Sequence, residues 1–353
     1  MTDGRSLEIK KTRNVFLDVL KGVAIILVVL GHSIQYGSGA EYLENNCFFD
    51  NAVYKMIYGF HMPLFMLISG YLFHHSIEKY SFSKNVKSRF MTLMLPIFCW
   101  AVVSYIISFL DGTLMVEYPF RAFYYIFIFT LWFLGAIFVC SFIVLIVNRF
   151  LRDSRIVYLC LFILAFVTPD GLVCKMYKFM YPFFVAGYFF AKDKGNLKQK
   201  KWMKQEMLLP IFTILYLVLL LFYRRESYIY NSPYCIIQDN PLAYLVNDLY
   251  RMCIGFVGSV SIILIVKLIY SKTNEDIAVN KCLTYIGKNS LGIYSVSTYL
   301  FSYLIPAVTR SLSELNYIIV CVISCVVIVC SLMVTELLKK VKLLNVLFLG
   351  GRK

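Results

Sequence analysis

Charged side chains are scarce in this sequence of 353 residues: Asp, Glu, Lys and Arg make up 16% of it, whereas hydrophobic residues make up 60%. A chain with so few charges is not an ordinary soluble domain. Many of its apolar runs approach twenty residues, which is the length of a helix that crosses the hydrocarbon core of a bilayer. The sequence therefore predicts an all-α, polytopic membrane protein.

The signatures of several other classes are also absent. The eleven cysteines form no CxxC pair and no Cys/His cluster with zinc spacing, so we expect no metal site. There is no repeat of about 20 to 50 residues, no low-complexity stretch, and no small-residue cleavage site after the first apolar run. We therefore expect one integral-membrane domain over residues 1–353, with cytoplasmic tails at about 1–14 and 339–353.

Ten apolar segments are predicted to span the membrane as helices around a central cavity. The fifth and sixth are short, and either lie with little tilt or re-enter where protein covers their backbone. The predicted spans are residues 15–36, 52–77, 90–110, 119–148, 156–168, 176–191, 207–223, 242–266, 285–305 and 316–338.

Loop charges agree with this count if both termini are cytoplasmic. The inner segments then hold 26 of the 35 Lys and Arg residues and the outer segments hold seven, as the positive-inside rule requires. This topology explains nearly all of the net charge of +15 without a nucleic-acid partner. A basic inner face also suits a polyanionic cytosolic ligand such as a nucleotide or coenzyme A.

The first span carries three ionisable residues on one helix face. At about 100° per residue, Lys21 and His32 lie about 20° apart, and Asp18 lies about 60° from Lys21. Each such residue costs about 2.5 to 3.5 kcal/mol to insert near the helix centre. The stripe is therefore expected to face the bundle interior or a wet cavity.

A second histidine lies in the outer half of the second span. His61 precedes Pro63, which frees a backbone carbonyl and can bend the helix toward a cavity. His32 and His61 lie roughly 6 and 14 Å below the outer ends of their spans. The two imidazoles are predicted to share a pocket reached from outside the cell. The alternative is that each is a hydrogen-bonded packing residue.

Three further features each allow two interpretations. Arg251 either pairs with Asp248, three residues earlier, or contacts substrate. Trp132 either lies at the lipid interface, where tryptophan is common, or belongs to the substrate-binding residues. Basic residues before the third span contact either lipid headgroups or the phosphates of a cytosolic cofactor; this group is Lys84, Lys87 and Arg89.

Several segments, taken together, resemble the acyltransferase-3 family of integral-membrane O-acyltransferases, in particular the fucose 4-O-acetylase-like branch of surface-polysaccharide acetylases. The resemblance covers residues 13 to about 300 in family order, and its first two pieces are the most specific. The matching pieces are LDVLKGVAIILVVLGHS, FHMPLFMLISGYLF, KSRFMTLMLP, LWFLGAIF, YPFFVAGYFF and IGKNSLGIYS.

The resemblance implies a function. Family members have ten or so helices and move an acyl group, usually acetyl from cytosolic acetyl-CoA, to a hydroxyl of an extracytoplasmic glycan. The bacterial inner membrane is the expected location, and a lipid-linked sugar or a polysaccharide is the expected acceptor. A homo-oligomer is compatible with this arrangement. The choice between acetyl and succinyl stays open.

The resemblance also assigns roles. The family's basic residue and histidine, eleven positions apart, correspond to Lys21 and His32, although many relatives have arginine at the first position. Its basic motif corresponds to Lys87 and Arg89, which are expected to bind the donor, and its Ser-Gly pair corresponds to Ser69 and Gly70.

The chemistry of the residues fits these assignments. A neutral imidazole near pKa 6.5 can act as the general base toward a sugar hydroxyl, and His32 is the predicted base. His61 is expected to orient the acceptor or stabilise the oxyanion, and Arg251 could do either. Asp18 and Lys21 are expected to line the path of the donor.

One position departs from the family pattern. Relatives often have a histidine three residues after the tyrosine of SLGIY, where this chain has Ser297. Two rival functions stay open. One is a transporter or flippase of a lipid-linked sugar, whose buried charges would line a translocation route. The other is a scaffold that has kept the family's shape without turnover.

Overall fold

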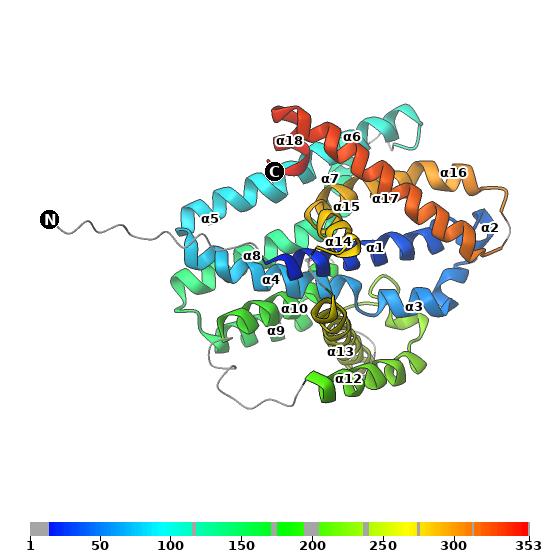
Figure 1. The fold of residues 1–353 in the computed structure, drawn as a ribbon. Helices are drawn as coiled ribbons and strands as arrows, with labels where there is room; N and C mark the ends of the chain where they lie inside the picture. The colour runs from blue at the N-terminus through cyan, green and yellow to red at the C-terminus, as the bar shows by residue number, and fades with distance from the viewer. Residues whose placement is uncertain are drawn as a thin grey trace.

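A computed structural model describes residues 14–114, 118–170, 175–193, 205–235, 240–273, 276–312 and 314–351. Within these residues every regular element is helical (Figure 1), as predicted. The α-helices are α1 (Val15–Tyr36), α2 (Ala40–Glu44), α3 (Ala52–Tyr58), α4 (His61–Lys79), α5 (Phe82–Arg89), α6 (Leu95–Leu110), α7 (Pro119–Phe129), α8 (Trp132–Phe150), α9 (Arg155–Val167), α10 (Lys175–Lys192), α12 (Gln205–Leu221), α13 (Pro241–Lys272), α14 (Ala278–Lys288), α15 (Ser290–Tyr299), α16 (Ile305–Thr309), α17 (Tyr317–Lys340) and α18 (Lys342–Leu349).

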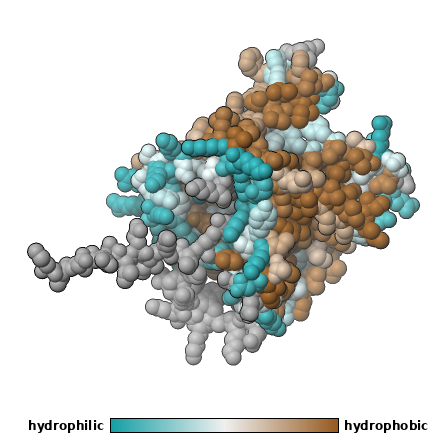
Figure 2. All heavy atoms as spheres, turned by 45° about the horizontal axis from the view of Figure 1, so that its top comes forward, coloured by the Kyte–Doolittle hydropathy of each residue, from teal (hydrophilic) through white to brown (hydrophobic). Residues whose placement is uncertain are grey.

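Seven helical runs in the described residues are long and apolar enough to cross a membrane, and each corresponds to one of the predicted spans. Three shorter apolar helices lie beside them: α7, α9 and most of α12. Many large apolar side chains point outward, and a broad hydrophobic band covers one face in Figure 2. A surface of this kind needs lipid as its solvent. The chain is thus a multi-pass membrane protein.

The second predicted span is interrupted next to a proline. Pro63 has no N–H to donate to the carbonyl of Gly59, and its ring crowds that carbonyl. The helix ends at Tyr58 and restarts at His61, with Phe60 between them at φ −140° and ψ −17°. His61 thereby becomes the first residue of a new helix rather than a residue in the middle of a span.

The single helix predicted over residues 119–148 was wrong. The chain leaves helical geometry at Leu131, with φ −122° and ψ 47°, and forms α7 and α8 instead. The Leu131 carbonyl accepts the N–H groups of Leu134 and Gly135, which starts α8. The break leaves Trp132 at the first position of a helix.

Two π-helical turns lie just before prolines. The turn at Phe90–Met94 joins α5 to α6, and the turn at Leu300–Leu304 joins α15 to α16. Each is followed by a proline at the second position of the next helix, Pro96 or Pro306. A missing proline N–H leaves a carbonyl unpaired, and a wider turn accommodates it.

The structure describes most of the predicted C-terminal tail but little of the N-terminal one. Residues 1–13 of the N-terminal tail lie outside the described residues. In the C-terminal tail, residues 342–349 form α18, which packs on α6 and α17. The Trp100 indole N–H donates to the Phe348 carbonyl over 3.1 Å, so this tail is held against the bundle.

The turn between α8 and α9 is organised by one carboxylate, that of Asp153. Arg152 and Asp153 both adopt left-handed backbone geometry, with φ 52° and 53°. The carboxylate accepts hydrogen bonds of 2.8 Å from the hydroxyls of Tyr158 and Tyr188 and pairs with Lys192. Burial raises the pKa of Asp153, but the hydrogen bonds to its ionised form outweigh that effect and hold the pKa below its ordinary value of 3.8.

We expect Asp153→Asn to lower the free energy of unfolding at pH 7 by about 2 kcal/mol, because hydrogen bonds to a charged group are lost. A depressed folded-state pKa stabilises the fold above the unfolded-state pKa, and this contribution disappears as pH falls through the folded-state value. The melting temperatures of variant and wild type in detergent should therefore converge in strong acid. A gap that stays constant with pH would contradict this account.

Candidate functional site

A cavity of about 750 Å³ lies where α1 ends, against the α3–α4 break, α15 and the α7–α8 break. Twelve of its 25 lining residues are Phe, Tyr or Trp, and none is Asp, Glu, Lys or Arg among the residues that the structure describes. We call it the large cavity. Its walls offer aromatic faces and neutral hydroxyl and amide groups, which suit a ligand with apolar faces and hydroxyl edges.

His32 projects into the large cavity from the last turns of α1. Its Nδ1 lies 3.2 Å from the Tyr58 hydroxyl, which in turn lies 3.3 Å from Gln35 Oε1. The amide oxygen can only accept, so the Tyr58 hydroxyl donates to Gln35 and accepts from His32 Nδ1–H. This relay leaves the lone pair of the neutral ring on Nε2.

His61 lines the same cavity and is buried. Its Nδ1 lies 2.9 Å from the carbonyl of Ile57, which can only accept, so Nδ1 carries the proton. The rings of His61 and Tyr58 are 4.6 Å apart between centroids. Tyr58 therefore contacts both histidines, and the structure brings them together at one site.

A smaller cavity, of about 150 Å³, is lined by three of the predicted site residues. Lys21, Ser69 and Arg89 all line it. The Lys21 ammonium pairs with Asp18 over 2.6 Å, and the Arg89 guanidinium lies 4.3 Å from the Phe73 ring centroid. We call it the small cavity; its charged lining residues come from the second turn of α1 and the end of α5.

The two cavities adjoin. Val28, Met62 and Tyr294 line both of them, so these side chains form part of the wall between them. Val28 lies one helical turn before His32. A ligand reaching from the small cavity past Val28 would thus approach the imidazole in the large cavity.

The other predicted residues occupy different places. Trp132 lines the large cavity, whereas Lys87 is exposed on α5 and does not line either cavity in the described structure. Arg251 pairs with Asp248 over 2.6 Å and lines a third pocket, of about 30 Å³, which shares Tyr58, His61, Met62, Trp132 and Tyr230 with the large cavity. Ser297 is buried, and its hydroxyl donates to the Tyr294 carbonyl.

One cluster outside the cavities has atoms suitable for a metal. His74, His75 and Glu78 place ligand atoms within 4.8 Å of one another at the end of α4. The Glu78 carboxylate lies 3.2 Å from His74 Nε2 and 3.4 Å from His75 Nδ1. Glu78 thus links the two rings, whereas His74 Nδ1 is buried without a hydrogen-bond partner among the described residues. The cluster lies apart from the histidines of the large cavity.

Sequence reasoning missed several lining residues. Gln35 follows His32 by three positions on the same helix, so helical spacing alone could have identified it. Tyr58 precedes His61 by three positions, but the helix break between them hid their relation. Tyr230 and Asn231 reach the large cavity from a distant connecting segment, and no local pattern identifies them.

Comparison with known proteins gives a consistent result. A family model described as an acyltransferase domain matches residues 14–336. Nodulation protein NolL of Mesorhizobium japonicum is 30% identical over 230 residues, covering 62% of this chain and 59% of that protein. NolL of Sinorhizobium fredii is 30% identical over 226 residues, covering 62% and 60%. The chain thus spans about three fifths of the length of these curated relatives. No solved structure matches the chain.

Proposed function

Because the chain belongs to the acyltransferase-3 family, we propose that this membrane O-acyltransferase moves an acetyl group from cytosolic acetyl-CoA to a hydroxyl of an extracytoplasmic glycan. The observation that carries the proposal is the pair of adjoining cavities. The small one is cationic and the large one is aromatic and uncharged, and His32 lies near their shared wall. The topology predicted from loop charges puts the first on the cytoplasmic side and the second on the outer side.

The donor would bind through its phosphates at the basic end. Lys21 and Arg89 supply positive charge at the small cavity, and exposed Lys87 adds charge on the same helix as Arg89. Guanidinium and ammonium groups bind phosphate by charge-assisted hydrogen bonds. Asp18 would hold Lys21 in place through their ion pair. The pantetheine arm would then extend past Ser69 and Val28 toward His32.

His32 would act as the general base. Its Nε2 takes the proton of the acceptor hydroxyl while the hydroxyl oxygen attacks the thioester carbonyl carbon. The tetrahedral intermediate collapses and the carbon–sulfur bond breaks. The leaving CoA thiolate takes the proton from His32 Nε2–H, which restores the neutral imidazole. The products are an acetyl ester and CoA.

His61 fits the role of orienting the acceptor better than that of stabilising an oxyanion. Its Nδ1–H is used by the Ile57 carbonyl, so a neutral ring offers only the Nε2 lone pair. That lone pair can accept a hydrogen bond from a second sugar hydroxyl. Trp132 and the neighbouring aromatic rings would pack against the faces of the sugar.

A transporter of a lipid-linked sugar is the rival function. A diphosphate linker would need cationic partners, and the lining of the large cavity contains no Lys or Arg among the described residues. The experiment that separates the two uses purified protein in liposomes with acetyl-CoA labelled in its acetyl group. Transfer of label to an oligosaccharide, with release of CoA, supports the proposal. Sugar movement without thioester consumption would overturn it.

In the same assay we expect Arg89→Ala to raise the KM for acetyl-CoA by about 10- to 100-fold, the range for a lost charged hydrogen bond. The KM for the acceptor should stay near the wild-type value, since the small cavity binds only the donor. Added salt should shrink the difference between variant and wild type.

The matched control is Lys84→Ala. Lys84 lies on the same helix and is exposed, and its ammonium stacks over Tyr80 rather than lining the small cavity. Equal donor KM values for the Arg89 variant, the Lys84 variant and wild type would show that the small cavity is not the donor site.

A further inference from the structure

The segment at 225–235, between α12 and α13, forms part of the wall of the large cavity. Tyr230 and Asn231 line the cavity directly. Tyr228 lies against the loop before α3: its ring centroid is 4.6 Å from that of Phe49, and its hydroxyl donates to the Phe49 carbonyl over 3.1 Å. We call residues 225–235 the outer segment. Its shape therefore sets part of the shape of the large cavity.

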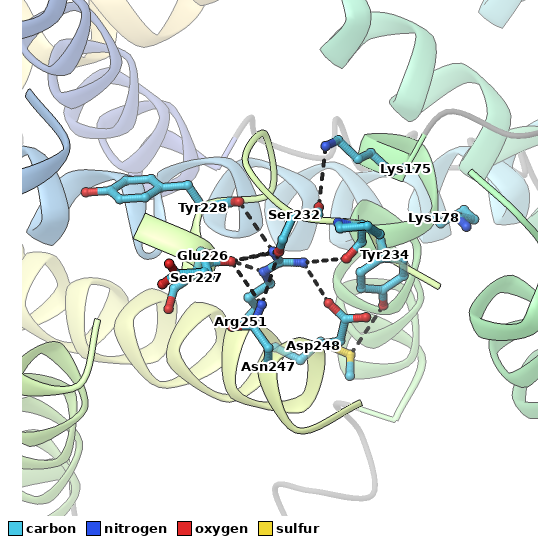
Figure 3. A network of polar contacts seen from close by, with 12 residues as sticks. Lys175, Lys178, Glu226, Ser227, Tyr228, Ser232, Tyr234, Asn247, Asp248 and Arg251 are labelled. Atoms are coloured by element: carbon cyan, nitrogen blue, oxygen red, sulfur yellow. Dashed lines mark hydrogen bonds and ion pairs between the residues drawn. The ribbon is translucent and has the colours of Figure 1, made fainter. Parts of the chain in front are cut away.

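One buried guanidinium holds the outer segment in this shape (Figure 3). Arg251, on α13, is 2% exposed, and its partner Asp248 is 0% exposed. Arg251 donates to Asp248 Oδ1 over 2.6 Å, to the Ser232 hydroxyl, and to four backbone carbonyls. These carbonyls are those of Glu226 at 2.6 Å, Ser227 at 3.2 Å, Pro233 at 3.2 Å and Tyr228 at 3.4 Å.

These bonds join both ends of one loop. The carbonyls come from positions 226–228 and 233, so the loop between them closes around the guanidinium and projects Tyr230 and Asn231 outward. Lys175 of α10 supports the same loop, because its ammonium donates to the Tyr230 carbonyl over 2.9 Å. No other residue type supplies five N–H donors in a planar fork, so a lysine could not satisfy the same set.

A buried ion pair of this kind is weak evidence for stability, since removing two charges from water offsets much of their attraction. Its consequence here is geometric. Asp248 fixes one edge of the guanidinium, and the remaining N–H groups are then directed at the loop carbonyls. Arg251 does not line the large cavity itself in the described structure. It lines the adjoining pocket of about 30 Å³ together with Tyr230, and its hydrogen bonds go to Asp248 and to the outer segment.

We propose that Arg251, oriented by Asp248, is a positioning residue for the acceptor: it folds the outer segment so that Tyr230 and Asn231 form the acceptor-binding wall. This inference rests on the proposed function, in which the large cavity holds the acceptor. The donor site and the general base lie on other elements, namely α1, α4 and α5. The role of Arg251 is therefore specific to one substrate.

Steady-state kinetics of the full chain in liposomes test this separation. We expect Arg251→Lys to raise the KM for the acceptor about tenfold, with kcat and the KM for acetyl-CoA within about twofold of wild type. The matched control is Arg225→Lys, in the same segment but exposed and paired with Asp50. Asn231→Ala removes a wall side chain that does not bond to Arg251, together with its hydrogen bond to the Arg225 carbonyl. It should also raise the acceptor KM.

A labelling experiment tests the loop independently of turnover. Cys235, at the end of the outer segment, is 1% exposed, whereas Cys47 is exposed and serves as the reference. A membrane-impermeant maleimide should label Cys235 in the Arg251 variant but not in wild type or in the Arg225 variant.

The outcomes separate the two proposals. Equal acceptor KM values, or a rise in both KM values, would overturn the positioning role even though transfer occurs. Continued protection of Cys235 in the Arg251 variant would overturn it as well. If wild type transfers no acetyl group, the proposed function fails; the labelling result then still shows whether Arg251 holds the loop. If the Arg251 variant does not fold, unchanged acceptor KM in Asn231→Ala overturns the proposal.

Discussion

His32→Ala should reduce kcat for acetyl transfer by about 10²- to 10⁴-fold, the usual contribution of a positioned general base. The hydrogen bonds from His32 to Tyr58 and from Tyr58 to Gln35 place the proton on Nδ1. Nε2 therefore carries the lone pair that can accept a proton in the large cavity. Substrate binding should change little, since the aromatic walls and the small cavity stay intact. The measurement is ester formation on the acceptor at saturating acetyl-CoA, with protein amounts matched.

The control for this variant is His75→Ala. His75 is also a histidine of a membrane helix, but it lies at the far end of α4 beside Glu78 and is partly exposed. Its removal should leave kcat near the wild-type value. If His32→Ala retains wild-type turnover, the assignment of the general base is wrong, whatever the variant's effect on KM.

Gly187→Val should prevent the bundle from assembling, at a cost of about 3 kcal/mol or more, the upper end of overpacking. α4 and α10 lie side by side (Figure 1). A Cβ at Gly187 would lie 2.1 Å from the Leu67 carbonyl oxygen, and one at Gly70 would lie 2.0 Å from that of Phe184. Backbone atoms of a packed helix cannot move aside as a side chain can.

Ala186→Val is the matched control, because Ala186 is the neighbouring residue, already carries a Cβ and is only partly buried. Size-exclusion profiles and melting temperatures of detergent-purified protein provide the measurement. We expect the Gly187 variant to aggregate or to be lost, and the Ala186 variant to resemble wild type. A monodisperse Gly187 variant with an unchanged melting temperature would show that the helices are not this close.

Hydropathy predicted the helices well wherever a span was uninterrupted. The first span was predicted at 15–36, and α1 has those bounds. The interruptions were harder to predict, since they depend on a few backbone groups. Pro63 signalled a bend, but the helix break falls three to four residues earlier, at the carbonyl that the proline leaves unpaired. The break at Leu131 has no proline or glycine within three residues of it, so composition does not reveal it.

The predicted site residues also differ in how far the sequence could identify their roles. His32 and Lys21 could be identified because helical periodicity puts them on one face, and each now lines a cavity. The role of Arg251 depends on which carbonyls surround it, and these come from a segment about 20 residues earlier in the chain. Local sequence therefore identified the ion pair with Asp248 as one option but could not predict the loop around it.

The wall shared by the two cavities bears on which acyl group can be delivered. Of the three residues that line both cavities, Val28 and Met62 are apolar and Tyr294 is polar but neutral. Acetate is small and, as a thioester, carries no charge, so it passes hydrocarbon at little energetic cost. A dicarboxylic acyl group would carry its second, ionised carboxylate past these three side chains, none of which is a cation. We therefore expect the shared wall to favour a small uncharged acyl group over a dicarboxylic one.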